Sequence, residues 1–301
     1  MTDEIVIDVK NLTKDYGNNR GIFDFNFQIK KGEVVGFMGS NGAGKTTTIR
    51  NIMGFLKPDK GKITVCGLDA WKDAEKIKKH IGYIPGEIAF PDLKTGTLFL
   101  QSQAEFLNVK DMSYANYLIE KLQLDPTANL KRMSKGMKQK TAVVAALMAN
   151  PDILILDEPT TGLDPLMRVA FIEILEEEKS KGKTILISSH MYEELEKICD
   201  RVILIDKGKI LNIANMNEIK NRNVVDFKIE FNNESDYKNF KKLKYNVIRD
   251  QQKYNQVTIS INKSKLTNLF KDLTAFDVKF ISEVKYTLEK HFSKITNKGG
   301  K

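Results

Sequence analysis

Two hydrophobic patterns predict two kinds of strand in the N-terminal part of the chain. Apolar residues occupy alternate positions from Ile5 to Val9 and again from Phe23 to Ile29, which predicts half-buried antiparallel strands joined by the turn-rich residues 16–19. Three later runs lack this alternation and are typical of parallel strands covered on both faces: 153–156, 184–187 and 202–205. Helical patterns separate these runs. We therefore expect an α/β core with an added antiparallel portion.

Residues 85–150 carry little strand signal and predict a helical insertion. Apolar positions recur at helical spacing in Leu98–Leu107, Tyr114–Leu122 and Gly136–Ala149. The last of these segments ends just before Pro151, which cannot continue a helix without the loss of a hydrogen bond. We therefore expect a helical subdomain at about 85–150, within a first domain that covers residues 1–215.

A different order of elements begins after residue 215. The expected order is strand, helix, two strands, helix, strand and a final helix: Val224–Phe231, Glu234–Leu243, Tyr245–Arg249, Tyr254–Ile261, Ser264–Leu273, Val278–Val284 and Thr287–Ile295. The hairpin turn is expected at 250–253, and Ser264 is the candidate N-cap of the second helix. The order β-α-β-β-α-β predicts a small ferredoxin-like α+β domain at 216–301.

Charge distinguishes the two predicted domains. The chain carries a net charge of +9, and residues 216–301 hold 18 Lys or Arg against 10 Asp or Glu, hence +8. A basic domain suggests an anionic partner, which could be a nucleic acid, a phospholipid surface or an acidic protein. A solvated, lysine-rich surface explains the same excess equally well.

Composition also bears on the compartment. The apolar runs fall far short of the roughly 18 residues that cross a bilayer. The N-terminus lacks the basic and apolar segments of a signal peptide. Cys66 and Cys199 form no metal-binding or redox spacing, so we expect both to be reduced, buried thiols. These features predict a cytoplasmic protein.

A phosphate-binding loop lies between the apolar run 34–38 and a helix-compatible stretch. The loop consists of Gly39, Ser40, Asn41, Gly42, Ala43, Gly44, Lys45 and Thr46. Its glycines let successive N–H groups point at phosphate oxygens, and the N-terminus of the following helix adds partial positive charge. Lys45 is placed to reach the β- and γ-phosphates and Thr46 to ligate Mg²⁺, and Thr47 joins the nucleotide-binding residues. The loop predicts that the chain binds ATP or GTP.

The strand predicted at 153–156 ends in two carboxylates, Asp157 and Glu158. A parallel strand delivers such residues to the edge of the sheet where the phosphate loop also lies. We expect Asp157 to complete the Mg²⁺ shell, directly or through water. Glu158 is the candidate general base for the attacking water.

The sequence around these carboxylates resembles one family. From about Ile5 to Ile213 the chain is similar to the nucleotide-binding subunit of an ABC transporter. The matching positions are 157–160 for the Walker B end, 162–164 for the D-loop, 133–137 for the signature, His190 for the switch histidine and Tyr16 for the ring against adenine. The resemblance implies an ABC-type P-loop NTPase with a parallel core sheet, an antiparallel β-subdomain and a helical subdomain. It also implies that Lys45, Glu158 and His190 act in ATP hydrolysis.

The resemblance further implies that two subunits complete each site. Ser134 and Gly136 open a helix, and in the family this second anion site caps the γ-phosphate on the partner subunit. Asp164 of the D-loop joins the cofactor-binding residues. We therefore expect a homodimer, or a heterodimer with a related subunit. A separate membrane permease, docked along Glu87–Thr97, would hold the pair on the inner face of the membrane.

Two departures from the family pattern affect the predicted site. The signature often reads Leu-Ser-Gly-Gly-Gln, and the segment 133–137 keeps Ser134 and Gly136 but differs at its first, third and fifth places. The glutamine expected after the strand 81–85 is replaced by Gly86, with Glu87 next. Either Glu87 takes over the water and Mg²⁺ contacts, or that role is absent. These features and the appended domain resemble exporter subunits that pair with separately encoded six-helix permeases.

A soluble, non-transport ABC ATPase with a basic nucleic-acid-binding domain is the alternative from another class. The aromatic signature of RNA-recognition sheets is absent from 278–286, so we expect no nucleic-acid partner. A regulatory or dimerising role for the C-terminal domain is compatible with transport, and we favour it over a lipid or RNA role.

Overall fold

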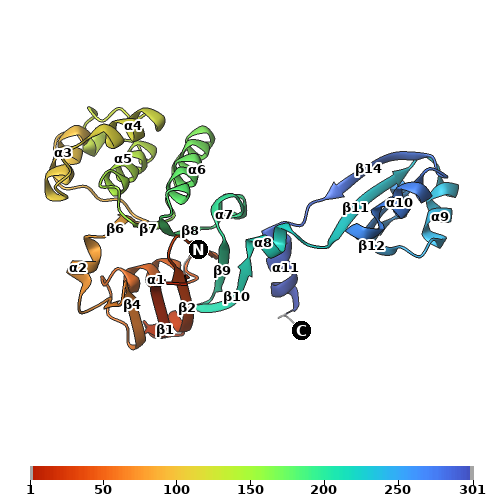
Figure 1. Cartoon of the computed structure of the whole chain (residues 1–301), viewed down its shortest axis with the longest axis horizontal. Coiled ribbons are helices and arrows are strands. Elements are labelled where there is room, and N and C mark those ends of the chain that lie inside the picture. Colours follow the sequence, from red (N-terminus) through yellow and green to blue (C-terminus); the bar gives the residue numbers. More distant parts are fainter. Residues whose placement is uncertain (1–2, 299–301) are drawn as a thin grey trace. The chain divides into compact units, whose positions relative to one another are not determined.

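The computed structural model describes residues 3–298 and divides into two compact units, Met1–Asn215 and Met216–Lys301 (Figure 1). The first unit contains a six-stranded sheet. In spatial order its strands are β10 (Lys209–Asn215), β9 (Arg201–Asp206), β3 (Val34–Met38), β8 (Thr184–Ser189), β7 (Ile153–Asp157) and β6 (Ile81–Ile84). Neighbouring strands are parallel from β9 to β6, and β10 is antiparallel to β9. Every residue of β3, β7 and β8 is buried, which confirms the prediction of covered parallel strands.

A second, antiparallel sheet contains the N-terminal strands, and both predicted strands depart from the alternation. In order its strands are β2 (Gly21–Lys30), β1 (Ile5–Asp15), β4 (Lys60–Val65) and β5 (Leu68–Asp69). On β1, Ile5 is 40% exposed, whereas Ile7 and Val9 are buried as predicted. Alternate residues from Phe25 to Ile29 are buried as predicted. Phe23 is only half-buried and Ile22 is in the core instead, because Asp24 has a left-handed backbone with φ of 57°. The ladder between β1 and β2 shifts register in this region, as it does at a β-bulge.

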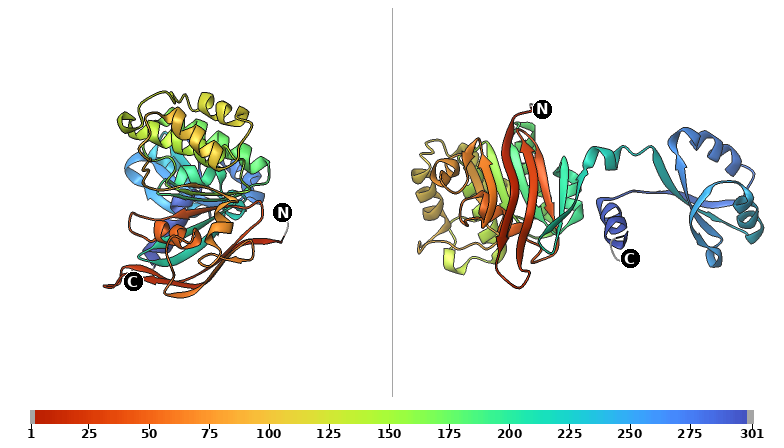
Figure 2. Two further views of the ribbon diagram at one scale, coloured as in Figure 1. Left: turned by 90° about the vertical axis from the view of Figure 1, so that its left-hand side faces the viewer. Right: turned by 90° about the horizontal axis from the view of Figure 1, so that it is seen from below.

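The helices of the first unit include a separate helical subdomain. Four helices accompany the sheets: α1 (Lys45–Ile52), α2 (Ala74–Lys78), α6 (Pro165–Ser180) and α7 (Tyr192–Ile198). The helical subdomain contains α3 (Gly96–Phe106), α4 (Ser113–Lys121), the 3₁₀ turn η1 (Leu130–Arg132) and α5 (Lys135–Leu147). These elements gather away from the antiparallel sheet (Figure 1, Figure 2). The three predicted helices are confirmed to within two residues at each end. None of the helices in residues 3–298 has both the length and the apolar content that a bilayer crossing requires.

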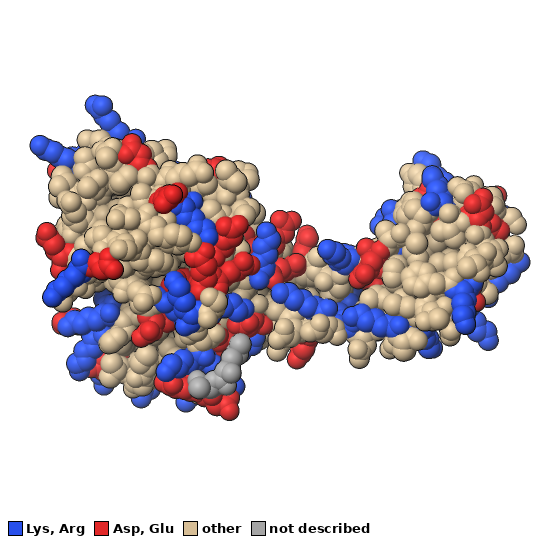
Figure 3. Space-filling model, turned by 45° about the horizontal axis from the view of Figure 1, so that its top comes forward, with Lys and Arg blue, Asp and Glu red and all other residues tan. Residues whose placement is uncertain are grey.

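The second unit is an antiparallel sheet whose core lies against two helices. Its strands in order are β12 (Asn246–Gln251), β13 (Gln256–Asn262), β11 (Val224–Phe231) and β14 (Val278–Val284). The other elements are α8 (Met216–Lys220), α9 (Glu234–Lys242), α10 (Leu266–Leu273), α11 (Leu288–Lys298) and the 3₁₀ turns η2 (Gln252–Tyr254) and η3 (Lys263–Lys265). Apolar side chains from the sheet, α9 and α10 form one buried cluster. The strands and helices follow the predicted order β-α-β-β-α-β. On the face drawn in Figure 3, this unit carries both Lys or Arg and Asp or Glu side chains.

Two local predictions in the second unit are wrong. Ser264 does not cap α10, because the side-chain oxygen of Asn262 accepts hydrogen bonds from the N–H and the hydroxyl of Ser264. This contact forms η3 and delays the start of α10 to Leu266. The hairpin turn also falls two residues later than predicted. β12 continues to Gln251, and Asn255 supplies the left-handed conformation that the turn needs, with φ of 48°.

The prediction of two buried thiols is correct for Cys199 and wrong for Cys66. Cys66 and Gly67 form the two-residue turn between β4 and β5. Both have left-handed backbones, with φ of 50° and 78°, as a primed hairpin turn requires. The turn geometry therefore determines the exposure of the Cys66 side chain.

Candidate functional site

A pocket of about 510 Å³ opens at the loop between β3 and α1. It is lined by Ser40, Asn41, Gly42, Ala43, Gly44, Lys45, Thr46 and Thr47, together with Tyr16, Asn19, Arg20, Gly21, Glu158, Lys207 and Gly208. Most residues predicted from the phosphate-binding loop therefore face one space. Gly39 is buried beneath the loop, where its carbonyl oxygen binds Lys45.

The conformation of the loop requires glycine at positions 39 and 44. A Cβ atom on Gly39 would lie 2.3 Å from the carbonyl oxygen of Ile205. Gly44 has φ of 118°, and a Cβ atom there would lie 2.5 Å from the side chain of Ile22. Gly44 is also the N-cap of α1, and no described side chain caps this helix. The first N–H groups of α1 are thus available to an anion in the pocket.

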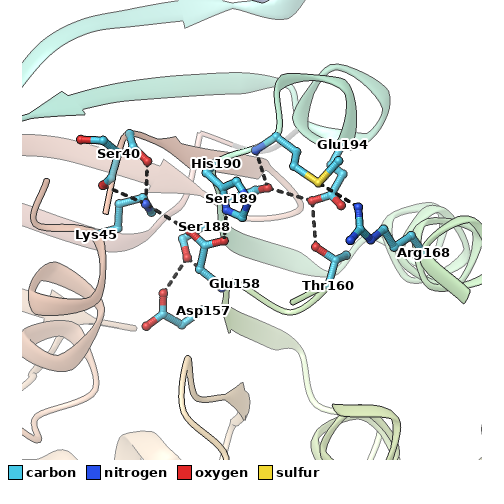
Figure 4. Close-up of polar contacts among 12 residues, drawn as sticks. Ser40, Lys45, Asp157, Glu158, Thr160, Arg168, Ser188, Ser189, His190 and Glu194 are labelled. Carbon is cyan, nitrogen blue, oxygen red and sulfur yellow. Dashed lines mark hydrogen bonds and ion pairs between the residues drawn. The ribbon is translucent and has the colours of Figure 1, made fainter. Parts of the chain in front are cut away.

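Lys45 carries the positive charge at the base of the pocket. The residue is 5% exposed. Its Nζ atom donates hydrogen bonds to the carbonyl oxygens of Gly39 at 2.6 Å and Ser40 at 3.2 Å. The same atom lies 3.1 Å from Oε1 of Glu158 (Figure 4). The ammonium group is therefore fixed to the loop while it faces the pocket, which suits it to contact phosphate oxygens.

The two carboxylate oxygens of Asp157 differ in their hydrogen bonding. Asp157 is fully buried, and its Oδ1 atom accepts a hydrogen bond from the Ser188 hydroxyl at 2.6 Å. Oδ2 has no hydrogen-bond partner among the described residues. A Cβ atom on Gly86 would lie 3.0 Å from Oδ2, so glycine at 86 leaves this oxygen uncovered. A hard, unpaired carboxylate oxygen close to the loop that carries Thr46 fits the oxygen ligands that Mg²⁺ prefers.

Glu158 is held in a strained conformation that directs its carboxylate into the site. Its φ of 49° lies in the left-handed region, which is unfavourable for glutamate. Its N–H donates to the Ser188 Oγ atom at 2.9 Å, and its Oε2 lies 2.7 Å from Nδ1 of His190. The carboxylate therefore lies between the Lys45 ammonium and the His190 ring (Figure 4). This arrangement can orient a water molecule and accept its proton.

Three predicted cofactor-binding residues lie outside this pocket. Ser134 caps α5, and its Oγ atom accepts a hydrogen bond from the Met137 N–H at 3.2 Å. Gly136 packs so closely that a Cβ atom would lie 2.8 Å from the carbonyl oxygen of Gly162. Asp164 caps α6 and accepts from the Met167 N–H at 3.0 Å. None of the three is among the described residues that line the nucleotide pocket of the same chain.

Of two other predicted site residues, Tyr16 lies at the pocket and Glu87 does not. Tyr16 lines the pocket and is 54% exposed, so its ring is available to a bound base. Glu87 is exposed and is not among the residues that line the pocket. The structure therefore adds no support for Glu87 as an Mg²⁺ ligand, and that role stays a prediction.

Several residues at the site were not predicted from the sequence. Ser188 bonds both Asp157 and Glu158, and its position after the apolar run of β8 is the signal that could have indicated it. Lys207 and Gly208 reach the pocket from the turn between β9 and β10, where both have positive φ. Tyr83, on β6, is not among the described residues that line this pocket. Burial and, to a smaller extent, the charge of Asp157 raise the pKa of Tyr83 to about 12.

Comparisons with known proteins agree with this geometry. Residues 22–161 match the family described as ABC transporter. The chain is 36% identical over 211 residues to the Nod factor export ATP-binding protein I of Burkholderia orbicola (strain AU 1054), which covers 67% of this chain and 68% of the relative. A solved ATP-binding subunit of an ABC transporter superposes with a TM-score of 0.64 and 31% identity over 71% of this chain and 92% of that chain. The dimeric structure of a bacterial ABC transporter cassette has the same fold, with a TM-score of 0.63 and 24% identity over 70% and 98% of the two chains.

Fold, pocket and relatives therefore lead to the same assignment. The phosphate-binding loop, the carboxylates at the end of β7 and the histidine after β8 lie together at one site. The alignment with the Nod factor export ATP-binding protein covers two thirds of both chains at 36% identity. The chain belongs to the family of ABC transporter ATP-binding proteins, and it is an ATPase.

Proposed function

We propose that this ATPase uses Mg²⁺ and ATP to drive export through a separate membrane permease, and that two copies close around two nucleotides in each cycle. The observation that carries the proposal is the position of Glu158, whose carboxylate lies 3.1 Å from Lys45 and 2.7 Å from His190. A carboxylate beside a phosphate-binding lysine can take the proton of an attacking water.

The residues of the pocket have separate roles in this scheme. Lys45 and the N–H groups of the loop stabilise charge on the phosphates, a contribution of about 3–4 kcal/mol per donor in other enzymes. The Thr46 hydroxyl and the free Oδ2 atom of Asp157 would hold Mg²⁺, which neutralises phosphate charge when it is bound. Glu158 orients and deprotonates the water, and His190 holds Glu158. Tyr16 stacks against adenine.

The position of the signature supports a dimer. Ser134 places the N-terminus of the 13-residue helix α5 at an exposed point outside the nucleotide pocket of the same chain. A helix N-terminus of this kind attracts a phosphate group. Ser134, Gly136 and Asp164 would therefore act on a nucleotide held by a second subunit. A homodimer is the simplest assembly, and a heterodimer with a related subunit follows the same geometry.

An apolar cavity supports the docking of a permease near 87–97. The cavity has about 250 Å³ and lies between β6, α3 and α5, where Tyr83, Phe90 and Phe99 line it. The ring centroids of Phe90 and Phe99 lie 4.7 Å apart, so the two rings pack against each other. A photoreactive cross-linker attached to a cysteine introduced at the half-buried Leu93 should give a cross-linked product with a permease in membranes. Absence of any product from engineered positions across 87–97 would contradict this site.

The two units would then have different tasks. We assign ATP hydrolysis to residues 1–215, with the helical subdomain at about 85–150, and a regulatory or dimerising role to residues 216–301. The permease would hold the assembly on the cytoplasmic face of the membrane. A soluble ABC ATPase with a nucleic-acid-binding second unit is the alternative. Recovery of the chain with RNA at low salt, and not with membranes, would favour that alternative.

Glu158→Gln tests the proposed chemistry. The substitution removes the base but keeps the shape of the side chain, so ATP turnover should fall by roughly 10²- to 10⁴-fold. ATP should still bind, and the variant should accumulate as an ATP-bound dimer that gel filtration resolves. Glu193→Gln, on the exposed side of α7, makes the same chemical change away from the pocket and serves as the control. Hydrolysis at the wild-type rate by Glu158→Gln would exclude Glu158 as the base.

A further inference from the structure

Glu194 is a buried carboxylate that has no part in the nucleotide pocket. The residue lies on α7 and is 5% exposed. Its Oε2 atom accepts hydrogen bonds from the hydroxyls of Thr160 at 3.0 Å and Ser189 at 2.8 Å. Thr160 follows Glu158 by two residues, and Ser189 directly precedes His190. One oxygen atom therefore joins the two loops that carry the Glu158–His190 pair (Figure 4).

Further contacts tie the same two loops together. The Ser189 Oγ atom also accepts a hydrogen bond from the Met191 N–H at 3.0 Å. Arg168 donates from Nε to the carbonyl oxygen of Leu163 at 3.0 Å, and its Nη1 atom lies 3.3 Å from Sδ of Met191. Residues on both sides of His190 are thus anchored to the loop after β7. Glu194 is the acidic group of this network.

The negative charge of Glu194 contributes little to the stability of the fold. Both donors to Oε2 are neutral hydroxyls, and Oε1 has no hydrogen-bond partner among the described residues. A buried carboxylate with one satisfied oxygen is less favourable for stability than an apolar side chain of the same size. What Glu194 supplies is an acceptor that two hydroxyls from different loops can share.

We propose that Glu194 is a positioning residue for ATP hydrolysis. It fixes the loop after β7 relative to the loop after β8, so that Nδ1 of His190 stays 2.7 Å from Oε2 of Glu158. A relative shift of the two loops by about 1 Å would take this contact beyond hydrogen-bond distance. The inference rests on the roles of Glu158 and His190 in the proposed function. It adds that the geometry of their contact depends on a residue outside the pocket.

Two substitutions at Glu194 test the inference. Glu194→Leu removes the acceptor and should lower kcat by roughly 10- to 100-fold, because it loosens the catalytic pair. KM for ATP should change less than about twofold, since the phosphate-binding loop is untouched. Glu194→Gln keeps one side-chain oxygen for the two hydroxyls and places its amide where Oε1 has no partner. It should recover at least about half of the kcat that leucine loses.

Two further variants keep the test decisive if Glu194→Leu does not fold. Thr160→Val and Ser189→Ala each remove one hydroxyl and leave the carboxylate in place. Each should lower kcat by roughly three- to tenfold at constant KM, and the double variant should lose less than the product of the two, because both hydroxyls serve one connection. Multiplicative losses would overturn the proposal.

The remaining outcomes separate this inference from the proposed function. Wild-type kcat in folded Glu194→Leu, a rise in KM that matches the fall in kcat, or a glutamine variant no better than leucine would each overturn the positioning role. Glu158→Gln is measured in parallel. If it loses activity while Glu194→Leu retains it, only the inference about Glu194 fails. If Glu158→Gln retains activity, the proposed base itself is wrong.

Discussion

Asp157 and Glu178 are both fully buried in the first unit, but their surroundings differ. Asp157 accepts one hydrogen bond, from the neutral Ser188 hydroxyl, and its second oxygen has no partner in residues 3–298. Glu178, on α6, accepts from the Tyr114 hydroxyl at 2.6 Å. It also pairs with Nζ of Lys181 at 2.6 Å and Nζ of Lys183 at 2.7 Å.

In the proposed function, this difference separates a ligand-binding carboxylate from a structural one. Burial alone raises the pKa of Glu178, but hydrogen bonds from Lys181, Lys183 and Tyr114 outweigh it and hold the pKa below its ordinary value. The charge of Glu178 is therefore neutralised within the fold. The free oxygen of Asp157 would gain a partner if the proposed Mg²⁺ bound there. For these two residues, the unpaired oxygen of Asp157 supports the proposed binding role, and the ion pairs of Glu178 support a packing role.

Asp157→Asn should give the largest effect and should act on turnover. Loss of the carboxylate charge weakens the Mg²⁺ site, and we expect ATP hydrolysis to fall by at least about 10²-fold. The free energy of unfolding without Mg²⁺ should stay the same or rise, because an unpaired buried charge is removed. Steady-state ATPase assays and urea unfolding, each with and without Mg²⁺, measure both quantities. Destabilisation by more than about 2 kcal/mol would show that Asp157 is structural.

Glu178→Gln should show the opposite profile. The substitution leaves two ammonium groups without their counter-charge, and Lys183 is itself only 6% exposed. Breaking a buried ion pair in this way lowers the free energy of unfolding by about 3–5 kcal/mol. ATP turnover per folded molecule should remain near the wild-type rate. Glu173→Gln is the control, because its exposed pair with Lys121 is worth less than about 1 kcal/mol.

The two carboxylates also differ in how far the sequence could identify them. Asp157 ends an apolar run that is typical of a buried parallel strand, and such a strand delivers its C-terminal residue to the sheet edge where the phosphate loop lies. Glu178 lies in a run of three glutamates, 176–178, which is typical of a solvated helix face. Its burial depends on Tyr114, 64 residues earlier on α4. No local pattern predicts a contact of that kind.

The same limit explains the errors in the predicted fold. Strand and helix positions follow from local periodicity, and they are confirmed in both units. The exchange of Phe23 for Ile22 in the core depends on the left-handed backbone of Asp24, and aspartate adopts that conformation in a minority of cases. Ser264 does not act as an N-cap because its N–H donates a hydrogen bond to the side-chain oxygen of Asn262, two residues earlier. Such outcomes depend on competition between neighbouring polar groups.

The contribution of Glu178 to the free energy of unfolding should depend on pH in the acid range. The pKa of Glu178 is lowered in the fold, so its contribution is complete above the unfolded value of about 4.5 and is lost as the pH falls through the lower, folded value. Urea unfolding from pH 6 to pH 3 should therefore show a steeper loss of stability for wild type than for Glu178→Gln. Equal slopes would mean that the three donors do not hold Glu178 ionised.

Tyr114→Phe should give the smallest effect of the series. It removes one hydroxyl donor to a charged acceptor and leaves both lysine pairs of Glu178 intact, so the free energy of unfolding should fall by about 1–2 kcal/mol. ATP turnover should not change. Tyr117→Phe is the matched control on the same helix, since its exposed hydroxyl binds the partly exposed Glu177. In the Glu178→Gln background the loss at Tyr114 should shrink by about half, because the hydroxyl then donates to a neutral amide oxygen. An undiminished loss there would mean that Tyr114 stabilises α4 through its ring and not through the buried charge.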